Sequence, residues 1–322
     1  MRVLVTRRWP EVVETEIQAL AEVTINESDE AMSADALAAA LGEFDVICPT
    51  VTDPLNAQVF AQAGSVRTKL LANFGVGVNH INLQAAHAAG IAVTNTPGVL
   101  TDATAEIALT LMLASARRTA EGERELRRGD WQGWRPTHML STQVTGKTLG
   151  VVGMGRIGIN MARKAHHGLG MRIVYFSRSP LDESIALELQ ATQLTLDQLL
   201  AQADFVSLHC PATPDTQHLI DAQALALMPP HAHLINTARG DVVDEEALVT
   251  ALEAGQIAGA GLDVYAQEPQ LAPGLTELDN VVLLPHMGSG TVETRIRMGR
   301  CALDNVRAYL QGTPLPNRVE GI

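Results

Sequence analysis

A glycine-rich turn between a buried strand and a helix places the tightest limit on how this chain folds. The motif Gly-x-Gly-x-x-Gly occupies residues 153–158, directly after the apolar run 148–152 and before a helical pattern that begins at Ile159. Such glycines allow a tight turn, a close approach of backbone to a pyrophosphate, and close packing of the helix on its sheet. The setting predicts a dinucleotide-binding α/β unit whose helix N-terminus receives the phosphates. The residues expected to contact them are Gly153, Gly155, Arg156, Ile157 and Gly158.

Strands and helices alternate along the rest of the chain. Short β-like runs are found at residues 2–6, 22–25, 45–48, 69–72 and 91–94, and again at 148–152, 172–176, 205–208, 232–236, 260–263 and 281–284. Helical patterns are found at 11–21, 33–41, 83–89, 101–118 and 291–311, and we expect Gly42 to end the second of them. The alternation predicts an α/β fold with two doubly wound parallel-sheet domains, one flavodoxin-like and one of the Rossmann type.

Size, charge and cysteine spacing exclude several classes of protein. A length of 322 residues exceeds what one hydrophobic core usually serves, which favours two domains. A formal net charge of −13 without a basic patch argues against a nucleic-acid partner. No apolar run is long enough to span a bilayer, so we expect no membrane partner. Cys48, Cys210 and Cys301 lie far apart and no signal-peptide pattern is found, which together favour the cytoplasm.

The residues that follow the second strand of the Rossmann-type series indicate which nucleotide is preferred. In NAD-binding proteins an acidic residue at this place accepts a hydrogen bond from the ribose 2′-hydroxyl. Here the run 172–176 ends in Ser177, Arg178 and Ser179, with no carboxylate. A guanidinium flanked by hydroxyls suits a 2′-phosphate, because it binds phosphate as a fork. We therefore expect NADP(H) to be preferred, while NAD(H) remains possible if Arg178 is only a surface residue.

Three apolar strands in the second half are each followed by polar residues. Arg239, Glu268 and His286 fall in the segments 234–240, 261–269 and 283–289, at or just past the strand ends where ligands bind in open α/β sheets. An arginine can bind a carboxylate in bidentate fashion. A histidine can donate a proton near neutral pH, and a glutamate can hold the imidazolium in place. The combination predicts reduction of a 2-keto acid, with His286 as general acid and no metal ion.

Two further segments extend this interpretation to the first half of the chain. Residues 73–81 read NFGVGVNHI, and residues 96–106 read TPGVLTDATAE. With the glycine turn and the three strand-end segments, these motifs resemble the D-isomer-specific 2-hydroxyacid dehydrogenases over nearly the whole length. Within that family the chain is most similar to the glyoxylate/hydroxypyruvate reductases. The resemblance implies an NAD(P)-dependent enzyme whose catalytic residues are Arg239, Glu268 and His286.

The resemblance also implies which residues bind the two ligands. Val76 and Gly77 should offer backbone N–H groups to the substrate carboxylate, together with the side chains of Arg239, His286 and, across a homodimer, Trp134. Further cofactor contacts should come from Thr104, Cys210, Pro211, Thr216, Thr237, Ala238, Arg239, Asp263, His286, Gly288 and Ser289. We expect a substrate-binding domain at residues 1–98 and 288–322, and a dinucleotide-binding domain at 99–287.

The identity of the substrate remains open at this point. Residues 50–53 should face the pocket with Trp134 and Met287, which leaves room for a small polar substrate. Glyoxylate and hydroxypyruvate are therefore the leading candidates. The alternatives are a dehydrogenase of another 2-hydroxy acid, including relatives of 3-phosphoglycerate or formate dehydrogenase, and a non-enzymatic NAD(P)-sensing interaction protein. Turnover of a small keto acid would discriminate between an enzyme and a sensor.

Overall fold

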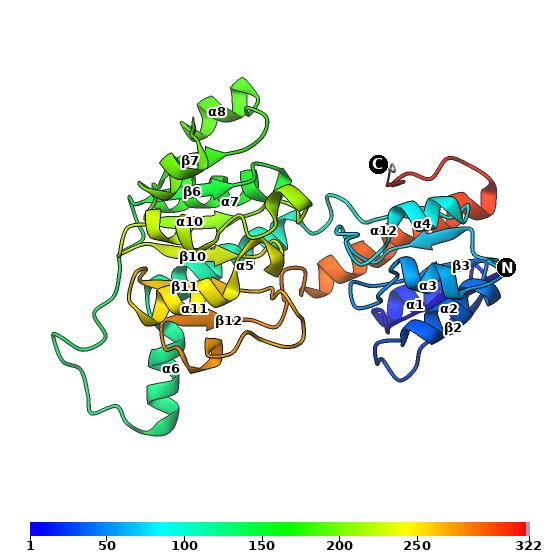
Figure 1. The fold of residues 1–322 in the computed structure, drawn as a ribbon, viewed down its shortest axis with the longest axis horizontal. Coiled ribbons are helices and arrows are strands. Elements are labelled where there is room, and N and C mark those ends of the chain that lie inside the picture. Colours follow the sequence, from blue (N-terminus) through cyan, green and yellow to red (C-terminus); the bar gives the residue numbers. More distant parts are fainter. Residues whose placement is uncertain (320–322) are drawn as a thin grey trace. The chain divides into compact units, whose positions relative to one another are not determined.

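The computed structural model describes residues 1–319 and divides into two compact units. Unit 1 comprises Met1–Leu100 and the segment that starts at Ser289, and unit 2 comprises Thr101–Gly288. The chain therefore passes from one unit to the other twice. In each unit helices cover both faces of one parallel β-sheet (Figure 1). The expected fold class, with two doubly wound parallel sheets, is confirmed.

Unit 1 has the strand order β2-β1-β3-β4-β5, and all of its paired strands are parallel. This is the flavodoxin-like order. Its strands are β1 (Arg2–Val5), β2 (Glu22–Ile25), β3 (Val46–Cys48), β4 (Leu70–Ala72) and β5 (Ala92–Thr94). Its helices are α1 (Glu11–Gln18), α2 (Ala34–Glu43), α3 (Ala57–Gln62), α4 (Leu83–Ala88) and α12 (Val292–Gln311).

The two faces of this sheet are covered by different helices. Strands β3 and β4 are buried along their whole length, as expected for parallel strands with helices on both sides. On one face Ile17 of α1 and Leu303 of α12 pack against the sheet. On the other face Leu37 of α2 and Val59 of α3 do the same. The C-terminal helix is thus part of the core of unit 1, although it comes last in the sequence.

Unit 2 has the strand order β12-β11-β10-β9-β6-β7-β8, again with parallel pairs. Its strands are β6 (Thr148–Val152), β7 (Arg172–Phe176), β8 (Thr192–Gln193), β9 (Phe205–Leu208), β10 (His233–Asn236), β11 (Gly259–Leu262) and β12 (Val281–Leu283). Its α-helices are α5 (Thr101–Ala116), α6 (Thr119–Arg128), α7 (Arg156–Leu169), α8 (Glu183–Leu189), α9 (Leu196–Leu200), α10 (Ala222–Leu227) and α11 (Glu245–Glu253). Three short 3₁₀ turns complete the described part: η1 (Pro214–Thr216), η2 (Gly240–Val242) and η3 (Leu275–Glu277).

Helix α5 is the central element of one face of this sheet. Leu111 and Met112 are fully buried and belong to the same core as Met161 of α7 and Ile235 of β10. Helices α9, α10 and α11 cover the opposite face. Within unit 2, helix α5 contacts β10, β11 and α7.

The ends of helices α1, α2 and α5 differ from the expectation, and α1 ends at Gln18 instead of residue 21. Helix α2 runs through Gly42 to Glu43, so the prediction that Gly42 ends it was wrong. A side chain at position 42 would place its Cβ 3.0 Å from the carbonyl oxygen of Ser65, so this glycine permits the helix to pack closely against the backbone of Ser65. Helix α5 ends at Ala116, and Arg118 has a left-handed backbone (φ 53°) that separates it from α6.

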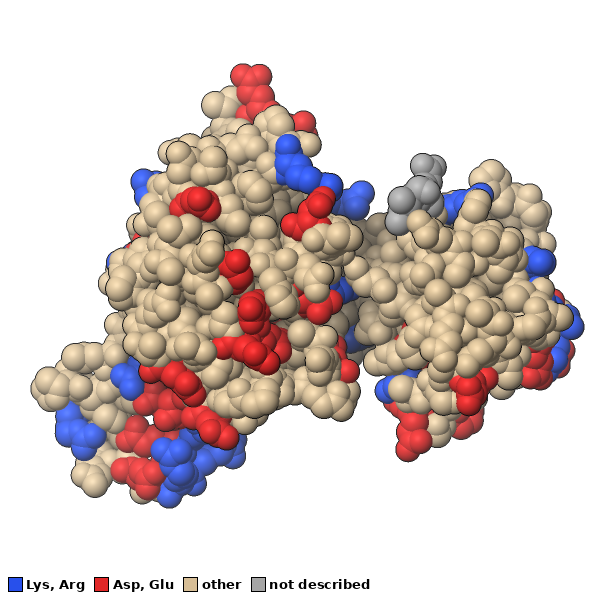
Figure 2. All heavy atoms as spheres, viewed as in Figure 1, with Lys and Arg blue, Asp and Glu red and all other residues tan. Residues whose placement is uncertain are grey.

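Charges of both signs are mixed on α6, the helix at the lower left in Figures 1 and 2. Arg127 pairs with Glu123 on the same helix, and Arg124 pairs with Asp279 at 2.6 Å. These arginines therefore form a solvated helix face in which their charges are balanced by carboxylates. No helix within residues 1–319 is both long and apolar enough to cross a membrane.

Candidate functional site

The polar residues that follow three neighbouring strands of unit 2 meet at one edge of its sheet. Strands β10, β11 and β12 are adjacent and parallel, so their carboxyl ends lie at the same edge. Arg239, Asp263 and His286 each follow one of these strands within three residues, and Glu268 lies further along the loop after β11. The structure therefore brings together the three residues expected to be catalytic.

His286 and Glu268 form a direct pair. The Nδ1 atom of His286 lies 2.8 Å from Oε2 of Glu268, and about a third of each side chain is exposed (33% and 34%). Since an ionised carboxylate only accepts hydrogen bonds, Nδ1 carries the donated hydrogen. This arrangement leaves Nε2 of the imidazole for a ligand.

The charge state of the glutamate follows from its surroundings. Burial alone would raise the pKa of Glu268, but the hydrogen bond and charge of His286 and the N–H of Tyr265 outweigh it, and the pKa lies below its ordinary value. Arg239 also contributes, because its charge interacts with that of Glu268. The carboxylate is therefore ionised at neutral pH and accepts the hydrogen bond from Nδ1 of His286.

The backbone of His286 is held in an uncommon conformation. Its φ is 54°, in the left-handed region that non-glycine residues rarely adopt. The following residue, Met287, donates its N–H to Asp263 at 2.6 Å, and the hydroxyl of Thr104 donates to the carbonyl of Gly288 at 3.0 Å. Asp263 is 1% exposed, and burial raises its pKa. Strain of this kind concentrates at functional sites, because the surrounding structure must maintain it.

Gly240 fixes the distance between the loops that carry Arg239 and Glu268. A Cβ at this position would lie 1.9 Å from the carbonyl carbon of Tyr265 and 2.0 Å from the nitrogen of Ala266. The same N–H of Ala266 donates to Glu245 at the start of α11, at 2.9 Å. No side chain larger than hydrogen fits at Gly240 without moving one of the two loops.

The glycine turn has the properties that a pyrophosphate site requires. Gly153 has φ 96°, and a Cβ there would lie 2.6 Å from the backbone nitrogen of Cys210. A Cβ at Gly155 would meet nothing within 4 Å, and no side chain caps the N-terminus of α7. A Cβ at Gly158 would collide with the carbonyl oxygen of Gly153 at 2.2 Å. The open space and the uncapped helix N-terminus of Arg156 and Ile157 fit an anionic group.

The loop that follows β7 carries an exposed arginine and no carboxylate before Asp182. Ser177 is half-buried, whereas Arg178 and Ser179 are exposed. Within the described chain no ion-pair partner of Arg178 is found, so its guanidinium is available to a ligand. The nearest carboxylate along the chain after β7 is Asp182, at the N-cap of α8.

The remaining residues expected at the cofactor lie on the loops after β9 and β10. Thr216 donates from its hydroxyl to the carbonyl of Pro211 at 2.7 Å, next to Cys210. Thr237 is 8% exposed, and its hydroxyl has no partner within residues 1–319. Ala238 accepts a hydrogen bond from Arg239 at 2.7 Å. The buried hydroxyl of Thr237 is the kind of group that a bound ligand would satisfy.

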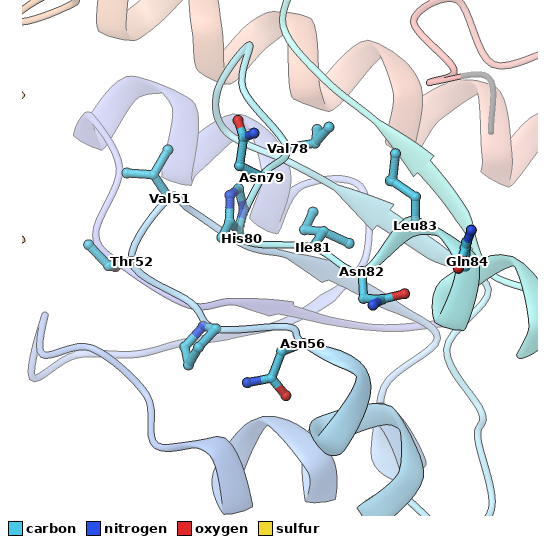
Figure 3. Close-up of a pocket in the computed structure, with 11 residues that line it drawn as sticks. Val51, Thr52, Asn56, Val78, Asn79, His80, Ile81, Asn82, Leu83 and Gln84 are labelled. Carbon is cyan, nitrogen blue, oxygen red and sulfur yellow. The ribbon is translucent and has the colours of Figure 1, made fainter. Parts of the chain in front are cut away.

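The residues expected to bind the substrate carboxylate lie on a loop of unit 1. Val76 is 37% exposed, and neither its N–H nor that of Gly77 donates to any described residue. The neighbouring residues 78–84 line one side of a hollow of about 550 Å³, and Val51 and Thr52 lie across from them (Figure 3). This hollow belongs to unit 1 alone.

Two expected residues lie apart from these groups. Trp134 is 82% exposed, on the long segment that runs out between α6 and β6 in Figure 1. Ser289 belongs to unit 1, although Gly288 before it belongs to unit 2.

Sequence reasoning missed Asn73, which holds the loop 75–77, and Gly240, at which the loops that carry Arg239 and Glu268 meet. The only signal for either was its place just after a strand. Within residues 1–319 no group of His, Cys, Asp or Glu suits a metal ion.

Comparison with known proteins identifies similar families and structures. The sequence profile of the D-isomer specific 2-hydroxyacid dehydrogenase, NAD binding domain, matches residues 109–288. The chain is 43% identical over 321 residues to a glyoxylate reductase of Korarchaeum cryptofilum, covering 99% of this chain and 95% of the relative.

Two solved structures are similar along nearly the whole chain. One is an NADPH-dependent glyoxylate/hydroxypyruvate reductase from Sinorhizobium meliloti in complex with NADP and malonate, with 34% identity, a TM-score of 0.86, and coverage of 99% and 96%. The other is the holo form of a D-mandelate dehydrogenase from Rhodotorula graminis, with 32% identity, a TM-score of 0.88, and coverage of 100% and 98%.

Proposed function

Because the chain belongs to the D-isomer specific 2-hydroxyacid dehydrogenases, which are NAD(P)-dependent oxidoreductases, we propose that it is an NADPH-preferring reductase of small 2-keto acids. Glyoxylate and hydroxypyruvate are the proposed substrates. The observation that carries the proposal is the 2.8 Å contact between His286 and Glu268 beside Arg239, at one edge of the sheet. The relatives named glyoxylate reductase support the same substrate size.

Each member of the site has a distinct role in this proposal. A bound NADPH would supply the hydride that adds to the keto carbon. His286 gives the proton on Nε2 to the carbonyl oxygen, so that C=O becomes CH–OH. Glu268 stabilises the imidazolium before the transfer, and Arg239 binds the substrate carboxylate and carbonyl oxygen. The N–H groups of Val76 and Gly77 bind the carboxylate from unit 1.

The proposal assigns the two ligands to the two units. Unit 2 binds the nucleotide, through the glycine turn, the loops after β9 and β10, and the end of β7, where Arg178 binds the 2′-phosphate. For the keto acid, unit 1 contributes the N–H groups of Val76 and Gly77, and unit 2 contributes Arg239 and His286. The structure of the Sinorhizobium meliloti relative is described as a complex with NADP, which supports a phosphorylated cofactor here. We also propose a homodimer that works in the cytoplasm.

The test is a spectrophotometric assay of NADPH and, separately, NADH oxidation. Glyoxylate, hydroxypyruvate, pyruvate and phenylglyoxylate are offered in turn, the last because the D-mandelate dehydrogenase relative favours a bulkier acid as the second candidate. We expect fastest turnover with NADPH and one of the first two. Turnover with phenylglyoxylate alone would favour the second candidate, and tight nucleotide binding without any turnover would favour a sensor.

A further inference from the structure

We propose that Asn73 is a positioning residue for the substrate carboxylate, because it fixes the loop 75–77 with its carbonyl groups turned inward and its N–H groups free. The inference rests on the proposed function, in which Val76 and Gly77 bind that carboxylate. Asn73 follows the last residue of β4 directly and is fully buried. It is therefore placed between the rigid sheet of unit 1 and the loop.

The amide of Asn73 is saturated by the loop and by one histidine. Its Nδ2 donates to the carbonyl oxygens of Gly75 and Gly77, each at 3.0 Å. Its Oδ1 lies 3.1 Å from Nε2 of His80, so the imidazole donates to it. One buried side chain is thus hydrogen-bonded to Gly75, Gly77 and His80, and a shorter side chain cannot make these contacts.

The loop carbonyl groups are also held by a neighbouring segment. The N–H of Thr96 donates to Gly75 at 3.0 Å, and the amide of Asn95 donates to the carbonyl of Val76 at 2.9 Å. Three successive carbonyl oxygens are therefore engaged by unit 1 itself. The N–H groups of Gly75, Val76 and Gly77 donate to none of the described residues. A run of successive free N–H groups makes a site for an anion.

His80 supports Asn73 from the side of the hollow. Figure 3 shows His80 between Asn79 and Ile81, among the residues that line this hollow of about 550 Å³. The segment around it is anchored, since Ile81 donates its N–H to Val78 at 2.9 Å and Asn82 donates to Leu55 at 2.7 Å. The imidazole therefore holds the Asn73 oxygen from a fixed position.

The experiment compares Asn73→Ala with Thr68→Val. Thr68 lies just before β4, is fully buried, and has its hydroxyl within 3.1 Å of the carbonyl oxygens of Leu41 and Phe44. Thr68→Val therefore removes a buried side-chain hydrogen bond to backbone carbonyl groups at the opposite end of β4. Michaelis constants for glyoxylate, turnover numbers, NADPH dissociation constants and amide hydrogen exchange of the loop are measured for both variants and the unaltered protein.

We expect Asn73→Ala to raise the KM for glyoxylate about tenfold or more, with a much smaller change in kcat. NADPH affinity should stay the same, and the amides of residues 75–77 should exchange faster. Thr68→Val should lower stability without these effects. His80→Leu, which removes the hydrogen bond from His80 to Asn73 and leaves Asn73 itself in place, should raise KM less and serves if Asn73→Ala does not fold.

Two outcomes would overturn the inference: an unchanged KM and unchanged loop exchange in folded Asn73→Ala and His80→Leu, or equal effects from Thr68→Val. Failure of the unaltered protein to reduce any keto acid would count against the proposed function instead. The hydrogen-exchange comparison still decides in that case whether Asn73 orders the loop.

Discussion

The ring and the backbone of residue 286 meet separate requirements. The ring must pair with Glu268 through Nδ1, and the backbone must hold a left-handed conformation at φ 54°. Asparagine adopts that conformation more readily than most residues, yet it cannot act as an acid near neutral pH. His286→Asn should therefore remove the proposed proton donor with little effect on the turn.

We expect His286→Asn to lower kcat for glyoxylate by a factor on the order of 10² to 10⁴, the usual contribution of general acid catalysis. The dissociation constant of NADPH and the thermal unfolding midpoint should stay close to those of the unaltered protein. Steady-state kinetics and a thermal melt measure both quantities. A kcat within a few-fold of the original would show that another group supplies the proton.

Cofactor preference is also decided at the level of single residues. Replacing Ser177→Asp together with Arg178→Ala exchanges the cation that we propose to bind the 2′-phosphate for a carboxylate that suits a ribose hydroxyl. The ratio of kcat/KM for NADPH over NADH should fall by about 10- to 100-fold, since a hydrogen bond to a charged group contributes about 1.5–3 kcal/mol. Arg172→Ala, at the other end of β7, is the matched control. An unchanged ratio in the double variant would refute the assignment of Arg178.

At the scale of elements, one buried histidine joins helix α5 to the sheet of unit 2. His233 is the first residue of β10 and is 4% exposed. Its Nδ1 lies 2.8 Å from the hydroxyl of Ser115 on α5, and its ring stacks on Phe205 of β9 with centroids 5.2 Å apart. Burial lowers the pKa of His233 to about 4.

This lowered pKa predicts how stability depends on pH. A histidine with a folded pKa of about 4 binds fewer protons in the folded state than in the unfolded state, where the pKa is about 6.5. Its contribution to stability is therefore complete above pH 6.5 and is lost as the pH falls toward 4. The loss amounts to on the order of 3 kcal/mol.

His233→Phe keeps a ring on Phe205 and removes the titrating group. As the pH falls from 6.5 to 4, we expect the thermal unfolding midpoint of the unaltered protein to fall relative to that of the variant. His87→Asn, which removes an exposed histidine of unit 1, is the control. A difference that stays constant over this range would contradict the prediction.

The strands were predictable from the sequence because each is a compact apolar run. Strands β2, β6, β7 and β9 have the expected bounds, β11 is shifted by one residue at both ends, and the other expected strands differ by one residue at one end. The two-residue β8 lacks such a run and was not expected. The pattern of polar residues after β10, β11 and β12 likewise indicated which side chains would meet, because parallel strands share one carboxyl edge.

The features that sequence could not indicate depend on contacts between distant segments. Gly42 looked like a helix end, but it permits close packing against Ser65. The break between α5 and α6 depends on a left-handed Arg118, a residue type that gives no local sign of it. The close contact at Gly240 and the clamp at Asn73 each join loops whose spatial relation only the fold determines.

At the scale of the whole molecule, the segment between α6 and β6 presents apolar side chains to solvent in the single chain. Trp131 is 51% exposed, Trp134 is 82% exposed, and Leu140 is 67% exposed. Large apolar side chains that are exposed along one segment are typical of an interaction surface. A second copy of the chain is the partner that the proposed homodimer supplies.

We expect light scattering after gel filtration to give twice the mass of one chain. The double change Trp134→Ser and Leu140→Ser should shift the population toward single chains, because it removes exposed apolar area that dimerisation would bury. Leu187→Ser on α8, where Leu187 is 72% exposed, is the matched control. A single-chain mass for the unaltered protein at micromolar concentration would exclude the dimer.

The contact at Gly240 also constrains how such a chain can change over generations. Because this glycine touches the backbone between Tyr265 and Ala266, an inserted or deleted residue in either loop would move Arg239 relative to Glu268. Insertions and deletions should therefore be rejected by selection in both loops together. In descendants of this chain, the segments 236–240 and 262–268 should therefore both keep their present lengths, or change length together.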